Sequence, residues 1–195
     1  MAQLTQDEER TTLESQVREC YGRCAYSHKT HERMADRHAK WLGRVKLTQI
    51  ILAALTACGA LGVIFAKDGT YYAYGTAALS FVSLALNSYM KDLDPGEAAQ
   101  KHRETAADLW NIRESYLSLL TDVRSQCVQL EGLRERRDKL QDQLHQIYRT
   151  APHTDGKAYV EAQDRLKNKE DLTFSDPEID AMLPTTLKRS AGGQS

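Results

Sequence analysis

"TAALSFVSLALNS", residues 76–88, lies within an apolar stretch that is long enough to cross a lipid bilayer. Four polar residues recur in this stretch at steps of four, three and four positions: Thr76, Ser80, Ser83 and Asn87. A helix turns by about 100° per residue, so these side chains fall on one stripe roughly 60° wide. The sequence therefore predicts a helix of membrane length with a polar stripe along one side.

Two uncharged stretches lie on either side of a short turn. Residues 47–66 and residues 71–90 contain no Asp, Glu, Lys or Arg, and each is about as long as a helix that crosses the roughly 30 Å hydrocarbon core of a membrane. Residues 67–70, "KDGT", separate them and contain an Asp-Gly pair that is typical of a turn. We expect a two-span transmembrane helical hairpin, and a buried hairpin in a soluble protein is the alternative.

The distribution of positive charge predicts the orientation of this hairpin. The turn between the spans has a single cation, Lys67, beside Asp68. The outer flanks of the two spans are much richer in cations, which are Arg33, Arg37, Lys40, Arg44, Lys46, Lys91, Lys101 and Arg103. Because cytosolic flanks of membrane helices carry the excess of Lys and Arg, we expect both termini in the cytosol and residues 67–70 outside. The first thirty residues have no apolar core, so no secretory signal is expected.

The two flanks carry the apolar spacing of coiled coils. In residues 1–46 a stripe with alternate steps of three and four runs from Leu13 to Val45, and in residues 95–150 a second stripe runs from Ala98 to Ile147. Two helices that leave a membrane hairpin together run antiparallel, so the stripes should face each other. We expect an all-α protein whose transmembrane hairpin continues into a long cytosolic antiparallel coiled-coil stalk.

The second flanking helix is longer than the first. Pairing outward from the hairpin places Leu13 near residue 124 and leaves residues 130–149 without an intramolecular partner. We therefore expect four apolar residues of this segment to contact another subunit or a signalling protein: Leu133, Leu140, Leu144 and Ile147. Residues 151–195 begin with the helix-breaking "APHTDGK" and should form short helices and a disordered tail.

Composition argues against several classes of function. The chain has 26 Lys and Arg against 27 Asp and Glu, so it lacks the basic excess of a nucleic-acid-binding protein. It contains no nucleophile–base motif and no Gly-rich phosphate loop, so neither catalysis nor a cofactor is expected. Cys20, Cys24, His28 and His31 share a helical face, but four ligands along one straight helix cannot surround a zinc ion, and no metal is expected.

Three histidines occupy positions in the two apolar stripes: His31, His38 and His102. His38 and His102 lie at similar distances from the membrane in the predicted antiparallel register. One hypothesis is that they pair and respond to pH, since the histidine pKa is close to neutrality. The alternative is that all three are ordinary packing residues of the stalk.

The polar stripe also has two interpretations. Gln49 and Thr56 share one face of the first span, so the stripe of the second span can form hydrogen bonds with them inside a single hairpin. Alternatively, several hairpins gather so that the stripes line a water path, because polar groups at membrane depth face protein or water. We expect the second arrangement, with Thr76, Ser80, Ser83, Asn87, Gln49 and Thr56 as candidate pore-lining residues.

Two stretches next to the spans carry a family resemblance. "YSHKTHERMADRHAKWLG" precedes the first span, and "AAQKHRETAADLWNIRESYLSLL" follows the second with Ala99, His102, Arg103 and Ala106 in an A-x-x-H-R-x-x-A pattern. Over roughly residues 13–150, without the tail after Pro152, the chain resembles the SLATT family of two-span membrane effectors associated with SMODS nucleotidyltransferases and SLOG sensors.

The resemblance implies an effector of a bacterial anti-phage abortive-infection system in the inner membrane. Such an effector is expected to oligomerise with itself into a pore, or to disrupt the lipid bilayer, when a partner signals infection. The partners implied are a cyclic-nucleotide synthase, a SLOG protein or a reverse transcriptase. A non-conducting, membrane-anchored coiled-coil scaffold is the alternative.

Overall fold

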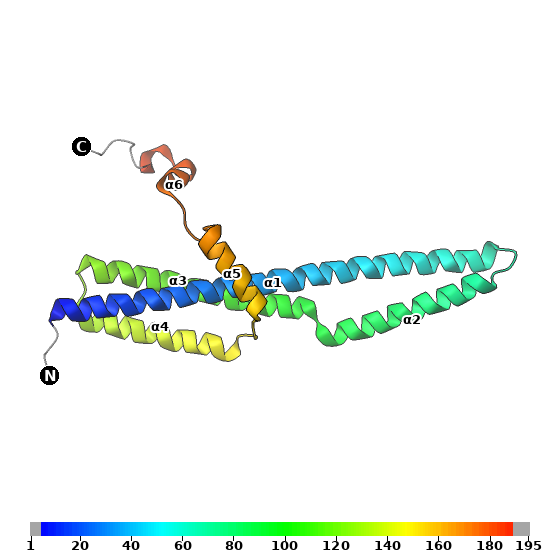
Figure 1. Cartoon of the computed structure of the whole chain (residues 1–195), viewed down its shortest axis with the longest axis horizontal. Helices are drawn as coiled ribbons and strands as arrows, with labels where there is room; N and C mark the ends of the chain where they lie inside the picture. Colours follow the sequence, from blue (N-terminus) through cyan, green and yellow to red (C-terminus); the bar gives the residue numbers. More distant parts are fainter. Residues whose placement is uncertain (1–4, 189–195) are drawn as a thin grey trace.

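The structure is a computed structural model that describes residues 5–188. Every regular element within this range is helical, which confirms the predicted all-α class (Figure 1). The elements are α1 (Gln6–Phe65), α2 (Thr70–Leu93), α3 (Pro95–Ser125), α4 (Leu130–Thr150), α5 (Gly156–Asn168), α6 (Asp176–Met182) and a short 3-10 helix η1 (Thr185–Leu187).

A single helix, α1, runs through most of the length of the molecule (Figure 1). It begins in a capping box, in which the Thr5 hydroxyl accepts the backbone N–H of Glu8 and the Glu8 carboxylate accepts the backbone N–H of Thr5. No proline interrupts its 60 residues, so it extends over about 90 Å. Residues 6–46 of this helix, together with α3 and α4, form a bundle that we call the stalk.

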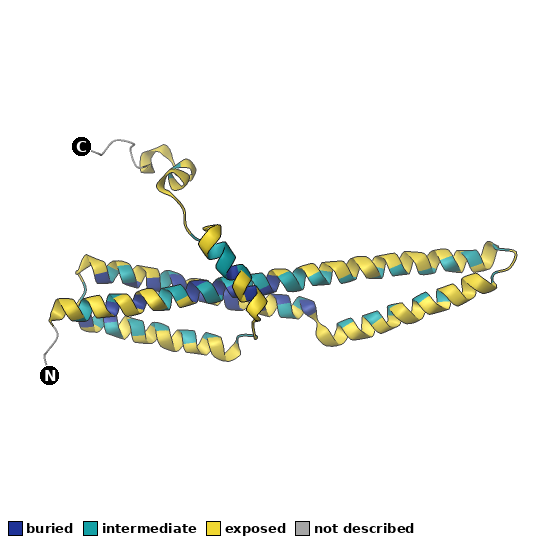
Figure 2. Cartoon of the chain, in the orientation of Figure 1, coloured by how far each residue is buried: buried dark blue, intermediate teal, exposed yellow. Residues whose placement is uncertain are grey.

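Residues 47–65 of α1 pack against α2, and we call these two segments the apolar hairpin. The two helices run side by side in opposite directions (Figure 1). Small residues allow a close approach, since a Cβ added at Gly59 would lie 2.3 Å from Thr76 Oγ1. Apart from this contact face, the hairpin exposes its large apolar side chains (Figure 2), and Phe65 is 82% and Phe81 72% exposed.

Within the described residues, one helix is long and apolar enough to cross a membrane, and it is α1. The 24-residue helix α2 is long enough but not apolar enough to qualify in the same way. The reason lies in its composition, because its tyrosines and the stripe from Thr76 to Asn87 lower its hydropathy. The polar stripe thus weakens the membrane signal of the second predicted span.

The stalk contains the core of the protein, visible as the dark blue region of Figure 2. Asp94 separates α2 from α3 with a positive φ of 27°, and its carboxylate accepts the backbone N–H of Glu97 at 2.9 Å. Pro95 then occupies the first turn of α3. From this point α3 returns along α1 and buries its apolar stripe against it, with Val17, Leu109, Tyr116 and Val123 almost completely enclosed.

The expected single helix over residues 95–150 is interrupted, and this part of the prediction is wrong. The helix α3 ends at Ser125, Gln126 adopts a left-handed conformation with φ of 57°, and α4 starts at Leu130 in the opposite direction. Arg10 of α1 holds the turn, because its guanidinium donates to the carbonyl oxygens of Val123 at 3.0 Å and Val128 at 2.9 Å. The chain reversal therefore depends on a contact between residues more than a hundred positions apart.

The reversal gives α4 an intramolecular partner, so the premise for an external contact at its leucines is also wrong. Leu133 is 0% exposed and belongs to the same core as Val17 and Tyr116. Three further residues of α4 pack partly buried against that core: Leu140, Leu144 and Ile147. The four residues stabilise the stalk of their own chain.

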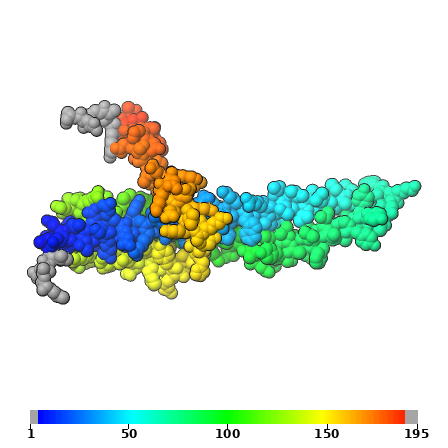
Figure 3. All heavy atoms as spheres, viewed as in Figure 1, coloured from blue at the N-terminus to red at the C-terminus, as the bar shows by residue number. Residues whose placement is uncertain are grey.

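The helices after Pro152 differ in how they relate to the stalk. The helix α5 crosses α1 and packs on it through Ala158 and Ala162, both 0% exposed. The helix α6 projects away from the body of the molecule (Figures 1 and 3), and Ser175 caps it with a capping box that includes Glu178. Most of the disordered end predicted from residue 188 onward lies outside the described residues.

Candidate functional site

The polar residues predicted to line a pore lie along one edge of the contact between α1 and α2. Asn87 accepts a hydrogen bond from the Gln49 side chain at 2.6 Å. Thr76 and Ser83 are half-buried against α1, whereas Ser80 is exposed. Thr56 donates its hydroxyl proton to the carbonyl oxygen of Leu52 in its own helix, at 2.8 Å. The structure thus joins Gln49 to the stripe and leaves Ser80 on the outer surface of the hairpin.

The three stripe histidines meet in the stalk, near the start of the apolar hairpin. The Nδ1 atoms of His31 and His102 are 2.9 Å apart. The ring of His38 stacks on that of His102, with centroids 5.6 Å apart and planes 15° apart. His31 is 4% and His102 2% exposed. We call His31, His38 and His102 the histidine cluster; His38 precedes Leu47 by about 13 Å along α1.

The environment of His31 and His102 favours neutral imidazoles. Burial, followed by the proximity of His102 and His28, lowers the pKa of His31 to about 4. Burial and His38 also lower the pKa of His102, against a smaller opposite effect of Asp155. With both rings neutral, one Nδ1–H donates to the other Nδ1. The cluster therefore joins α1 to α3 through a hydrogen bond that two protonated rings cannot form.

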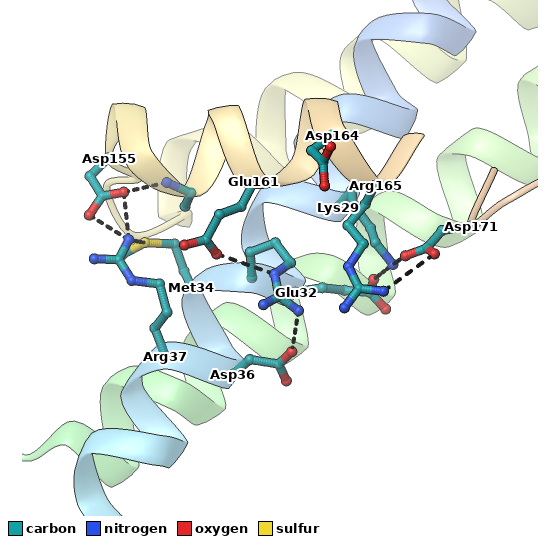
Figure 4. A network of polar contacts seen from close by, with 12 residues as sticks. Lys29, Glu32, Met34, Asp36, Arg37, Asp155, Glu161, Asp164, Arg165 and Asp171 are labelled. Carbon is teal, nitrogen blue, oxygen red and sulfur yellow. Dashed lines mark hydrogen bonds and ion pairs between the residues drawn. The ribbon is translucent and has the colours of Figure 1, made fainter. Parts of the chain in front are cut away.

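A row of ion pairs fastens α5 and the residues next to it across this part of α1 (Figure 4). Arg37 binds both carboxylate oxygens of Asp155 at 2.8 Å. The remaining pairs join Arg33 to Glu161 at 3.4 Å and Lys29 to Asp171 at 2.9 Å.

Asp155 has a second role in the same contact. Its carboxylate accepts the backbone N–H of Ala158 at 2.7 Å and so caps α5. That hydrogen bond and the Arg37 guanidinium lower the pKa of Asp155. One carboxylate thus starts α5 and ties it to α1.

The attachment of α5 is a feature that the sequence did not predict. The cations Lys29, Arg33 and Arg37 recur every four residues on one face of α1, and the acidic residues after Pro152 were available to pair with them. This spacing could have indicated that a segment with acidic side chains packs on this face of α1. It does not give the partner, however, because the pairing depends on where α4 ends and how the chain turns at Pro152.

The four residues considered for zinc do not form a metal site in the structure. In the part of the chain that the structure describes, no three His, Cys, Asp or Glu side chains come together as metal ligands. Burial raises the pKa of Cys24 to about 12, so its thiol stays protonated inside the stalk. His28 instead bonds through Nδ1 to the carbonyl oxygen of Ala106 at 2.9 Å. These side chains serve packing and helix–helix contacts.

Comparison with known proteins gives one family. The family model described as "SMODS and SLOG-associating 2TM effector domain family 4" matches residues 13–178. The match extends beyond the expected limit near residue 150, so the expectation that the tail after Pro152 lies outside the resemblance is wrong, and α5 belongs to the shared region. No curated protein and no solved structure matches the chain.

Proposed function

Because the chain belongs to the SMODS and SLOG-associating 2TM effector domain family 4, a family of two-transmembrane effectors of defence systems, we propose that it is an inner-membrane effector of a bacterial anti-phage abortive-infection system. Both of its termini lie in the cytosol in this proposal. Several copies assemble and open a pore in the bilayer, or disrupt it, when a partner protein signals infection.

The observation that carries this proposal is the apolar outer surface of the hairpin. Ile64, Phe65, Phe81 and Leu84 lie on the outside of α1 and α2 with most of their surface exposed. A soluble protein rarely exposes a continuous apolar surface of this kind, since transfer of such groups to water is unfavourable. A lipid bilayer covers it, and α2 with its 24 residues is long enough to span the hydrocarbon core despite its polar stripe.

The position of the polar stripe supports a pore assembled from several hairpins. The residues Ser80 and Asn87 lie on the exposed side of the edge between α1 and α2. When hairpins gather side by side, such an edge faces the neighbouring copies or a central water path. The stripe carries no charge, so a pore lined by it should discriminate poorly between ions.

The activating signal comes from another protein in this proposal. The family name associates these effectors with SMODS nucleotidyltransferases and SLOG proteins, and the sequence resemblance adds reverse transcriptases. The stalk offers the cytosolic surface for such a partner, and neither nucleic-acid binding nor catalysis by the chain is required.

Two matched serine substitutions test the lining role. Ser80→Leu places an apolar side chain on the stripe, whereas Ser88→Leu changes another exposed serine of α2 that lies about 80° away around the helix. We expect Ser80→Leu to reduce dye leakage from liposomes by about tenfold and Ser88→Leu to leave it unchanged, with the same oligomer size for both in detergent. Equal leakage from both correctly assembled variants would place the conduit elsewhere.

A further inference from the structure

The histidine cluster lies beneath the segment that leads from α4 into α5. A hollow of about 290 Å³ above His31 is lined by residues of α1 and α4, by Pro152, His153 and Thr154 of the connection, and by Tyr159 of α5. We propose that the histidine cluster and α5 form an acid-released latch, in which proton uptake by the cluster detaches α5 and its connection from α1. The proposal is independent of pore formation.

Several titratable or charged groups surround the cluster, and they come from each element packed there, including Tyr148 of α4 and Tyr159 of α5. α1 contributes His28, Glu32 and Arg37, and the connection contributes His153 and Asp155. α3 adds the charged Arg103 next to His102 in sequence, on the exposed surface. Both Asp155 oxygens are already bound by Arg37. Glu32 is bound by Lys29 at 2.9 Å, so both of these carboxylates already have a cationic partner.

The number of protons that the pair binds explains why the contact between His31 and His102 breaks in acid. In the neutral pair, one imidazole Nδ1–H donates to the other Nδ1 across 2.9 Å. A first proton binds the outer Nε2 of the donor ring and leaves the shared hydrogen bond in place. A second proton must occupy the accepting Nδ1, which leaves two N–H groups facing each other between two cations. His38, stacked on His102 with ring centroids 5.6 Å apart, adds a third ring close to the same charge.

The new charge acts on α5 through the cover that the connection forms over His31. Pro152, His153 and Thr154 line the hollow together with His31, so water reaches the charged pair when they move away. Asp155 opposes this release, because its charge favours a cationic His102. Its ion pair with Arg37 is nevertheless the most exposed attachment, with side chains 47% and 34% exposed. The rest of α5 is held by the more buried pairs Arg33 to Glu161 and Lys29 to Asp171 and by the packing of Ala158 and Ala162.

Release of α5 uncovers a cationic surface. Lys29, Arg33 and Arg37 fall on one face of α1, within about 80° of one another. The same face continues toward the apolar hairpin with Lys40 and Arg44, both exposed. The acidic groups of α5 and its neighbours thus cover one half of a continuous basic stripe and leave the half nearer the hairpin open. The latch controls whether the covered half is accessible.

Hydrogen–deuterium exchange of the full chain in detergent tests the latch directly. Exchange of residues 156–168 is compared at about pH 7.5 and about pH 5, corrected for intrinsic rates. We expect exchange of α5 to accelerate by at least about tenfold in acid, with residues 130–150 of α4 much less affected. Unchanged protection of α5 at the lower pH overturns the proposal.

Variants identify the cluster as the sensor. The double variant His31→Gln with His102→Gln should reduce the acid response of α5 to less than about twofold, whereas His145→Gln, at an exposed site of α4, should retain it. Asp155→Asn keeps a capping side chain but loses the ion pair, so α5 should exchange faster at both pH values. A full acid response in the double variant, or the loss of the response in His145→Gln, contradicts the assignment.

Discussion

His31 and His102 show how much depends on single buried side chains in this molecule. Their 2.9 Å contact joins α1 to α3 and is lost when both rings carry a proton on Nδ1. The sequence predicted that histidines of the two stripes would come to similar heights, which follows from the antiparallel register. It could not distinguish a hydrogen-bonded pair from a stacked one, because that choice depends on rotamers and on the residues that cover the cluster.

The pH dependence of stability follows from the lowered pKa of His31. In the unfolded chain this histidine has its ordinary pKa of 6.5, and in the folded chain the pKa is about 4. The unfolded state therefore binds more protons between these values, so the stabilisation is complete above about pH 6.5 and is lost as the pH falls toward about 4. We predict a melting temperature in detergent that decreases over this window.

The variant His31→Gln separates this effect from general acid denaturation. Its melting temperature should be lower at neutral pH and should change less between about pH 6.5 and about pH 4, while His145→Gln should behave as the unmodified chain does. An unmodified chain that melts at the same temperature throughout this window would contradict neutral burial of the cluster.

Among the elements, α4 separates what the sequence could predict from what it could not. Helices of the right type are predicted by the alternating steps of three and four, and Asp94 and Pro95 mark the start of α3. The break at Gln126 escapes such reasoning because residues 125–129 contain neither Gly nor Pro and the apolar spacing continues across them. Only the tertiary contact from Arg10 shows why the chain turns there.

Leu133 tests the intramolecular position of α4. Its side chain is fully enclosed, whereas Leu117 on α3 is 45% exposed. Leu133→Ala should lower the free energy of unfolding of the stalk by about 2–5 kcal/mol, because it removes buried methyl groups and leaves a cavity. The matched variant Leu117→Ala should cost less than about 1 kcal/mol. Denaturant unfolding in detergent measures both, and equal small effects would indicate that α4 does not pack as described.

At the scale of the whole molecule, α1 couples two different environments through one continuous helix. Its first part belongs to a charged stalk with a compact core, and its last part exposes apolar side chains. Charge and hydropathy along the sequence predicted this division, since the uncharged stretches are clearly bounded. The docking of α5 was not predicted, because the four-residue spacing of Lys29, Arg33 and Arg37 does not identify their acidic partners.

Thiol labelling in intact cells tests the orientation of the hairpin. In a chain whose four cysteines are replaced, Lys67→Cys lies in the turn between α1 and α2 and should react with a membrane-impermeant reagent. Ser15→Cys and Gly156→Cys, both exposed in the structure, should react only after the cells are opened. The reverse pattern would place the stalk outside the cell.

The most direct test of a membrane-permeabilising effector is release of an entrapped fluorophore from liposomes that contain the purified full chain. We predict release that rises steeply with the number of copies per liposome, because several hairpins must assemble and a high density of copies takes the place of the partner's signal. Release should fall in the Ser80→Leu variant but not in Ser88→Leu. Liposomes that retain the fluorophore at every protein density, although the chain is shown to span their bilayer and to oligomerise, would contradict permeabilisation and indicate a membrane-anchored scaffold.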